Sequence, residues 1–255
     1  MTIREAIREQ AKTMKNRTPK EKFSYFWEYY GLKTIALVAA LVTLIAFVVT
    51  MVTQKEYAFS GMFFGGEPTE AEAEYLNTFA QSAGIDLKKN QLSVKAAPDI
   101  RMDQLVSPEI YQYMETFTAM VASKSVDCFA ANEDLFLYYA YMGYAVDLRT
   151  VLTPQELETL APYLYYADNK LIELQENADG GYADAYSQRP VPTKPEEMED
   201  PVPVGISLDA ATAEFKEAYR FYGKNVIGLC ASSEHMDNAL AFLRRAVPAD
   251  NLPAA

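Results

Sequence analysis

The clearest pattern in the chain is one uninterrupted run of apolar residues near the N-terminus. Residues 34–53 read TIALVAALVTLIAFVVTMVT, without charge, proline or glycine. At 1.5 Å per residue, about 20 helical residues cross a hydrocarbon core of roughly 30 Å. Threonine hydroxyls can bond the helix's own carbonyls, so no polar group is left unsatisfied in lipid. The run predicts one transmembrane helix, Thr34–Thr53.

The flanks of this run predict its orientation. Residues 1–33 carry eight Lys or Arg against four Glu, and the aromatic stretch FSYFWEYYGLK just before the run resembles an interfacial belt. The whole chain carries −12, so the residues after position 33 carry −16. The positive-inside rule then places residues 1–33 in the cytoplasm and residues 54–255 outside the membrane. Ile3, Ile7, Ala11 and Met14 recur at helical spacing, which indicates a short amphipathic helix or a partly ordered tail.

A cleaved signal peptide is the main alternative for the apolar run. Its apolar region would be about 7–15 residues long, and Ala58-Phe59-Ser60 has the small residues of a cleavage site. The run is longer than that, and no cysteine follows it to accept a lipid. An uncleaved signal-anchor is therefore the favoured interpretation, while a buried core helix would be expected to show a polar face.

Beyond residue 54, short apolar runs alternate with segments of helical periodicity. This order is typical of an α/β domain with a mainly parallel sheet. The chain is long enough for such a domain to have two lobes. Residues 177–200, rich in Gly, Pro and acidic residues, predict a mobile loop. We expect strands over 57–64, 91–96, 126–130, 202–206 and 225–231, helices over 69–82, 107–123, 132–143, 153–162, 210–222 and 233–247, and two strands around a turn at Asp168-Asn169.

One stretch of the domain has a more specific pattern. Residues 126–148 read VDCFAANEDLFLYYAYMGYAVDL, and residues 202–247 contain VPVGISLD followed by a closing strand and an ALAFLRRAV helix. These segments resemble type 2 periplasmic solute-binding proteins, and the chain is similar to small membrane-anchored extracytoplasmic proteins of Gram-positive bacteria. The resemblance implies that the strand supplies a residue to a ligand cleft and that Asp147-Leu148 begins a cap of the second lobe.

The chain also departs from that family. About 190 residues are available for the domain, fewer than in a full solute-binding protein, and no Arg-rich or Trp-rich ligand clamp is evident. The resemblance therefore indicates a reduced or repurposed binding fold. In α/β sheets ligands bind at the carboxyl ends of strands, beside helix N-termini. The candidate ligand-binding residues at these ends are Gly65, Gly66, Asn132, Asp134, Ser207 and Asp209.

The residues that carry common catalytic chemistry are sparse. His235 is the only histidine, and no sequence pattern places it with a serine, Cys128 or Cys230, so neither a catalytic triad nor a transition-metal site is predicted. Both cysteines lie in apolar runs, as small core residues do, and whether they pair is left open. Neither Gly65-Gly66 nor Gly180-Gly181 is followed by the Lys-Ser/Thr that completes a phosphate-binding loop. The acidic run at 196–200 is interpreted as a solvated loop rather than a calcium site.

Charge and composition indicate the class of partner. A domain of −16 repels nucleic acid, and it suits cationic ligands or basic proteins. The 18 tyrosines add side chains common in cores and at interfaces. We expect a non-enzymatic, membrane-anchored binding or accessory domain without cofactors, held in the bilayer by one helix, with a small solute or an envelope or transporter protein as partner. The alternatives are a structural interaction subunit without a ligand and, more distantly, a hydrolase.

Overall fold

The computed structural model describes residues 18–53, 55–102, 107–176, 192 and 194–249. The chain divides into two compact units, Met1–Gln54 and Lys55–Ala255. The predicted amphipathic helix around Ile3 and Ile7 lies outside the described residues, as does most of the predicted loop at 177–200.

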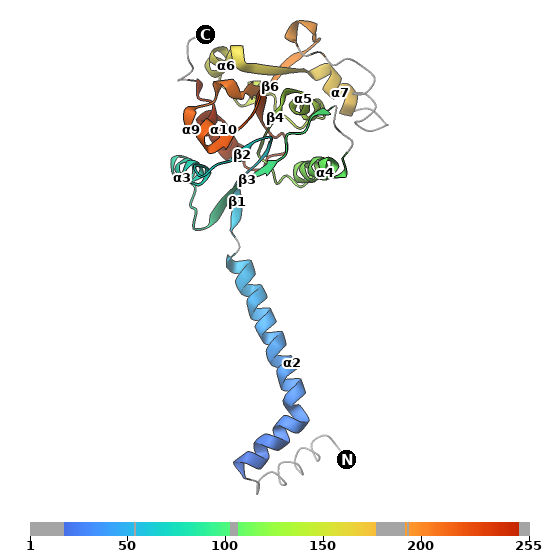
Figure 1. The fold of residues 1–255 in the computed structure, drawn as a ribbon, viewed down its shortest axis with the longest axis vertical. Coiled ribbons are helices and arrows are strands. Elements are labelled where there is room, and N and C mark those ends of the chain that lie inside the picture. Colours follow the sequence, from blue (N-terminus) through green and yellow to red (C-terminus); the bar gives the residue numbers. More distant parts are fainter. Residues whose placement is uncertain (1–17, 54, 103–106, 177–191, 193, 250–255) are drawn as a thin grey trace. The chain divides into compact units, whose positions relative to one another are not determined.

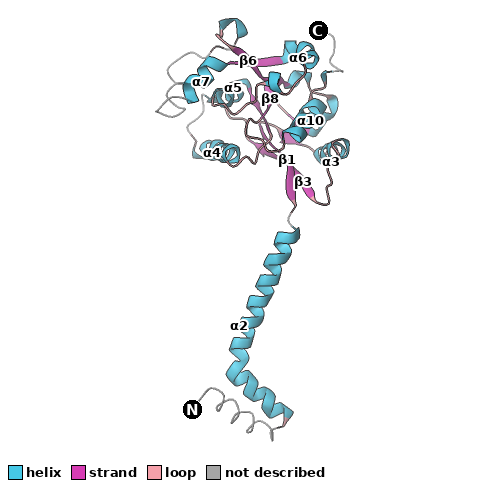
Figure 2. Ribbon diagram, turned by 180° about the vertical axis from the view of Figure 1, so that it is seen from behind, coloured by secondary structure: helices cyan, strands magenta, loops and turns pink. Residues whose placement is uncertain are grey.

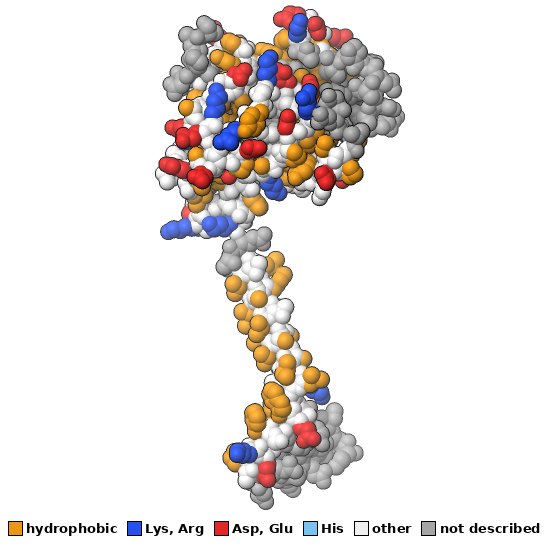
Figure 3. All heavy atoms as spheres, in the orientation of Figure 1, with side chains coloured by type: hydrophobic (Ala, Val, Ile, Leu, Met, Phe, Trp, Pro, Cys, Tyr) orange, Lys and Arg blue, Asp and Glu red, His pale blue; other side chains and the backbone are white. Residues whose placement is uncertain are grey.

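A single long helix, α2 (Pro19–Thr53), makes up the described part of the first unit (Figure 1). A capping box starts it: the backbone N–H of Thr18 donates to Glu21 and that of Glu21 to Thr18 (2.9 and 3.4 Å). The stretch Tyr30–Met51 has a mean hydropathy of 2.6 and is long and apolar enough to cross a membrane. Figure 3 shows this stretch as a surface of hydrophobic side chains.

The helix begins well before the predicted start at Thr34. Aromatic side chains four residues apart stack on its surface, Phe23 on Trp27 with ring centroids 6.1 Å apart and Phe26 on Tyr30 at 5.8 Å. Contacts between side chains at positions i and i+4 stabilise a helix. The aromatic residues before Thr34 therefore belong to the same helix as the apolar run. The hydroxyls of Thr43 and Thr50 donate to carbonyls four residues back at 2.9 Å, as the sequence predicted.

The second unit is built on one six-stranded sheet in the order β3-β1-β4-β8-β6-β5. β1 pairs in parallel with β3 and β4, while β8 is antiparallel to β4 and β6, and β5 is antiparallel to β6. Strands β3, β1, β4 and β6 therefore share a direction. The strands are β1 (Glu56–Phe64), β3 (Asn90–Ala97), β4 (Cys128–Asn132), β5 (Leu164–Asp168), β6 (Pro201–Ser207) and β8 (Asn225–Leu229), with a separate pair β2 (Glu67–Pro68) and β7 (Tyr219–Arg220).

Helices cover both faces of this sheet (Figure 2). One apolar cluster joins the sheet to α3, α6, α9 and α10, and the other joins it to α4 and α5. The expected α/β class is confirmed, and a division into two lobes is not. The helices are α3 (Glu72–Ser82), α4 (Pro108–Ala122), α5 (Glu133–Tyr141), α6 (Pro154–Leu160), α7 (Asn169–Glu176), α9 (Ala213–Ala218) and α10 (Met236–Ala246), with short 3₁₀ turns at Leu148–Thr150, Ala161–Tyr163, Pro195–Glu197 and Leu208–Ala210.

Two glycines let α5 approach the centre of the sheet. A Cβ atom on Gly205 of β6 or Gly228 of β8 would lie 2.5 or 2.7 Å from the ring of Phe136. The ring therefore lies directly on the backbone of two neighbouring strands. It also stacks on Phe129 of β4, with centroids 4.9 Å apart. This contact positions α5, whose first turn lies at the carboxyl end of β4.

Several local predictions are wrong. The turn expected at Asp168-Asn169 is the junction of β5 and α7, because the Asp168 carboxylate caps that helix by accepting from the N–H of Lys170 (3.1 Å). Thr69 and Glu72 do not form the expected capping box; the Thr69 hydroxyl donates to the carbonyl of Glu217 at 2.6 Å instead. The capping box at Thr153 is present as predicted.

Candidate functional site

The carboxyl ends of β1, β3, β4 and β6 meet at one edge of the sheet, because these four strands run in the same direction. This carboxyl edge carries all six residues that the sequence selected. The strand order also reverses here, since β3 and β4 lie on opposite sides of β1. Such switch points form ligand crevices in open α/β sheets. Gly65 and Gly66 follow β1, Asn132 ends β4, Asp134 lies in the first turn of α5, Ser207 ends β6, and Asp209 lies in the next turn.

The two glycines at the end of β1 are required by the backbone and by packing. Gly65 has φ +74°, in the left-handed region that favours glycine, and its N–H donates to the Ala97 carbonyl at 2.8 Å. A Cβ atom on Gly66 would lie 2.5 Å from the ring of Phe221. The space next to Gly66 is therefore filled by an aromatic side chain. Neither glycine opens a phosphate-sized cradle.

Asn132 bridges the two sides of the switch point. Its amide nitrogen donates to Asp99 Oδ1 at 2.7 Å and to the Ile100 carbonyl at 2.8 Å, and its Oδ1 accepts from the N–H of Leu135 at 3.0 Å. Both amide protons and the carbonyl oxygen are engaged, so Asn132 holds the loop after β3 against the start of α5. These bonds therefore connect the segments that follow β3 and β4, the two strands on either side of β1.

An open hollow of about 260 Å³ lies farther along the same edge, between the end of β6, α9 and the start of β8. Asp209 lines it, as do Lys216, Arg220, Phe221 and Asn225. The Lys216 ammonium donates to the backbone carbonyl of Asp209 at 2.8 Å. Buried Asn225 donates through its amide to the Tyr222 carbonyl at 2.9 Å. The hollow thus combines charges of both signs with an aromatic side chain, and its volume lies just below the range of about 300–1,000 Å³ that is typical of small-molecule sites.

A tyrosine and a glutamate extend the polar character of this edge. The Tyr165 hydroxyl donates a short hydrogen bond to Glu133, and the Lys224 ammonium lies 3.9 Å from the same carboxylate. Burial, then the hydrogen bond to Glu133 and the charge of Asp209, raise the pKa of Tyr165. Tyr165 therefore stays a neutral donor at physiological pH. No local sequence pattern joins Tyr165 and Glu133, because they are 32 positions apart, so neither is among the predicted site residues.

The structure does bring His235 close to an acid and a serine, which no sequence pattern predicted. The imidazole Nδ1 lies 3.4 Å from Asp127 Oδ1, and the Ser233 hydroxyl donates to that same oxygen at 2.6 Å. A catalytic triad needs the serine hydroxyl to donate to the histidine, which takes its proton. Here the serine donates to the aspartate instead, so the trio lacks the connection that activates a nucleophile.

Asp127 acts as a buried crosslink at the amino end of β4. Its side chain is 1 % exposed, and its Oδ2 accepts from the backbone N–H of Ser60 on β1 at 2.7 Å. The Asp127 carbonyl accepts from the N–H of Cys230 at 2.8 Å. The residue therefore ties β1, the end of β8 and the segment before α10 together.

The two cysteines are buried and free. Cys128 packs in the cluster beneath α3, α9 and α10, and Cys230 in the cluster beneath α4 and α5, so they face opposite sides of the sheet. Burial is the largest cause that raises the pKa of both thiols. Both are therefore core residues.

Among the described residues no group of three or more His, Cys, Asp or Glu side chains could hold a metal ion. The part of the acidic run that follows Glu197 folds around Asp168, whose carboxylate accepts from the N–H groups of Glu199 and Asp200 at 2.9 and 3.1 Å.

Comparison of the chain with protein-family models, with curated proteins and with solved structures gave no match.

Proposed function

We propose that the chain is a membrane-anchored extracytoplasmic binding or accessory domain without enzymatic activity. The observation that carries this proposal is the open hollow at the carboxyl edge, with Asp209, Lys216 and Arg220 beside the ring of Phe221. Charges of both signs over an aromatic wall suit a small polar solute that has an apolar part. In this proposal the single sheet corresponds to one lobe of the solute-binding proteins that the sequence resembles.

The anchored topology is the second part of the proposal. It is supported by the apolar stretch Tyr30–Met51, by the basic flank of residues 1–33 and by the acidic remainder of the chain. A protease added to intact cells should remove residues 55–255 and spare an N-terminal tag. Protection of the second unit would reverse the orientation, and release of that unit without protease would indicate a cleaved leader.

A thermal-shift screen of the full chain in detergent tests the binding function. The panel contains amino acids, sugars, peptides and polyamines. A ligand at 100 times its Kd should stabilise the fold by about 2.7 kcal/mol. The shift should be lost in Asp209→Asn and Arg220→Gln, and retained in Glu158→Gln, an exposed acid on α6. A shift that survives both edge variants would remove the carboxyl edge from the binding function.

A structural interaction subunit is the second candidate function. The packing at the switch point favours it, because Phe221 occupies the space next to Gly66 and Asn132 donates to Asp99 in the loop after β3. On this view the edge is a packed surface, and a partner protein contacts the unit elsewhere. Absence of any shift across the panel, together with copurification of a stoichiometric membrane partner, would favour this candidate over the first.

A further inference from the structure

The hollow at the carboxyl edge differs in charge from the unit that contains it. The whole chain carries −12 and residues 1–33 carry +4, so the remainder carries −16. The side chains that line the hollow include two cations, Lys216 and Arg220, and one anion, Asp209, which gives a local charge of +1. Charges farther away than a Debye length of about 8 Å are largely screened at physiological salt. The charge of a bound ligand is therefore selected by the lining and not by the acidic surface as a whole.

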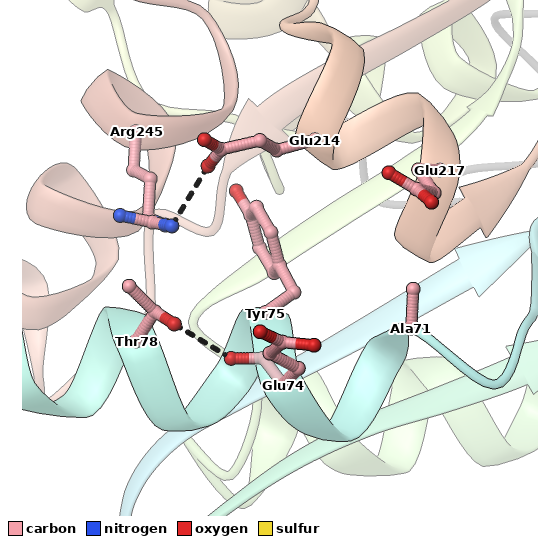
Figure 4. A pocket seen from close by; sticks show the side chains of 7 residues that line it. All are labelled: Ala71, Glu74, Tyr75, Thr78, Glu214, Glu217 and Arg245. Carbon is pink, nitrogen blue, oxygen red and sulfur yellow. Dashed lines mark hydrogen bonds and ion pairs between the residues drawn. The ribbon is translucent and has the colours of Figure 1, made fainter.

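Arg220 is a cation without a partner in the protein. Its guanidinium forms no ion pair or hydrogen bond within the described residues, not even with Glu67, its cross-strand neighbour in the β2–β7 pair. Arg245 provides a contrast. In a separate hollow between α3, α9 and α10, Arg245 forms an ion pair with Glu214 at 2.9 Å and lies over the ring of Tyr75 (Figure 4). The charge of Arg245 thus serves the fold, whereas the donors of Arg220 are available to a ligand.

Lys216 adds further donors to the same hollow. Its ammonium donates to the backbone carbonyl of Asp209 at 2.8 Å, which uses one of its three donors and holds the side chain in place. Two donors of Lys216 therefore remain beside those of Arg220. Carboxylates suit this combination, because a guanidinium binds both oxygens of a carboxylate and an ammonium adds a point charge.

Asn225 supplies an independent sign that a polar group is missing from the hollow. The residue is 3 % exposed and lines the hollow. Its amide nitrogen donates to the carbonyls of Tyr222 and Gly223 at 2.9 and 3.2 Å. These two bonds fix the orientation of the amide, and Oδ1 accepts no hydrogen bond in the part of the chain that the structure describes. Buried acceptors are rarely left unpaired, so Oδ1 calls for an external donor.

We propose that this hollow binds a small hydroxylated carboxylate, with the ligand carboxylate on Arg220 and Lys216 and a ligand hydroxyl donating to Asn225 Oδ1. The carboxylate of Asp209 is a second acceptor for hydroxyl groups, and the half-buried ring of Phe221 packs against the carbon atoms of the ligand. One negative charge on the ligand neutralises the lining. This inference rests on the proposed function and narrows its polar solute to one chemical class.

Calorimetric titration of the full chain in detergent with lactate, gluconate and mandelate tests the proposal. Each acid is compared with a polyol that lacks the carboxylate (propane-1,2-diol, glucitol, 1-phenylethane-1,2-diol) and with an acid that lacks the hydroxyls (propionate, hexanoate, phenylacetate). At least one hydroxy acid should bind once per chain and at least about tenfold tighter than both of its counterparts, because each counterpart leaves a polar group of the hollow unpaired.

Two results of this comparison identify which contact is wrong. A polyol that binds as tightly as its hydroxy acid would remove the anionic contact with Arg220 and Lys216. An unhydroxylated acid that binds as tightly would remove the contact with Asn225. Either result overturns the proposal, as does absence of binding by all three hydroxy acids.

The double variant Lys216→Gln/Arg220→Gln tests the two cations directly. It should weaken binding of the hydroxy acid at least about tenfold. Both side chains are exposed, so the thermal midpoint of the ligand-free chain should change little. The matched variant Lys170→Gln/Lys194→Gln removes two exposed lysines elsewhere and should change the affinity less than about twofold. Equal loss in both variants would reduce the effect to general attraction between charges and overturn the proposal.

Failure of this proposal and failure of the proposed function give different results. If a sugar or a polyamine shifts the thermal midpoint in a manner that depends on Asp209 and Arg220, while no hydroxy acid binds, the binding function stands and the ligand class is wrong. If no compound binds in either experiment, both are wrong.

Discussion

The amino end of β4 and the carboxyl edge of the sheet use polar side chains in opposite ways. At the amino end, Asp127 is buried and accepts from Ser60 and Ser233, so that its carboxylate is surrounded by protein. At the carboxyl edge, exposed Asp209 after β6 lines an open hollow, and the carboxylate of Glu133 after β4 keeps 37 % of its surface in solvent. A buried polar group is costly to disturb, whereas an exposed one can exchange water for a ligand. The first end therefore stabilises the fold, and the second is suited to binding.

Removal of the buried carboxylate should have the largest effect on stability. Asp127→Ala leaves the Ser60 N–H and the Ser233 hydroxyl without an acceptor, so we expect a loss of about 3 kcal/mol in the free energy of unfolding. Urea unfolding followed by circular dichroism measures it. Asp209→Ala is the control at the other end of the comparison and should cost less than about 0.5 kcal/mol. Similar losses in the two variants would contradict the division between a structural end and a binding end.

Filling the space at Gly66 should have the next largest effect. Gly66→Ala places a Cβ atom 2.5 Å from the Phe221 ring and 2.9 Å from Phe63 Cβ, and such overpacking costs about 1–3 kcal/mol. The same urea titration measures it. Combining it with Phe221→Leu should recover part of the loss, since the smaller side chain can move away. If Gly66→Ala left the free energy of unfolding unchanged, the switch point would have enough space for a ligand. That result would favour a binding role for this part of the carboxyl edge.

The partly exposed ion pair between Arg244 and Glu156 shows how such a contact changes the pKa of a carboxylate and, through it, the stability of the fold. Arg244 forms two bonds to Glu156, at 2.6 and 3.0 Å, and this contact is the main reason that the pKa of Glu156 falls to about 2. A lowered pKa contributes stability that is complete above the ordinary value of 4.5 and is lost as the pH falls toward 2.

Glu156→Gln should therefore cost about 1 kcal/mol at pH 7, discounted for solvent screening. The difference from the unchanged chain should shrink between pH 4.5 and 2, the window set by the lowered pKa. Urea unfolding at a series of pH values follows this difference. A difference that stays constant down to pH 2 would show that Glu156 acts through the helix cap with Thr153 rather than through the charge of Arg244.

The smallest effect is expected at the carboxyl edge itself. Tyr165→Phe removes the hydrogen bond to Glu133, but the carboxylate is 37 % exposed and water can replace the donor. We expect a loss below about 1 kcal/mol in the same unfolding measurement. A loss as large as that of Asp127→Ala would mean that the edge is part of the structural core rather than an adaptable surface.

The local elements of the fold could be predicted because their signals lie within a few residues. The apolar run 34–53, the strand before Gly65 and the capping box at Thr153 were located in this way. The turn predicted at Asp168-Asn169 is wrong, because the N–H groups of Glu199 and Asp200 that the Asp168 carboxylate binds are 31 and 32 positions away. Contacts of that separation leave no periodic trace in a single sequence.

The sequence by itself determined that one apolar helix precedes an acidic α/β unit and that six candidate residues follow strands. Only the tertiary structure decided what surrounds them. Strand order brought Asn132 against Asp99 in the loop after β3 and placed Asp209 at an open hollow. Packing of helices from opposite ends of the unit placed Tyr75 beside Arg245, 170 positions later. The physical reason is that periodicity specifies which face of an element is buried, whereas the identity of its neighbour depends on how the whole sheet assembles.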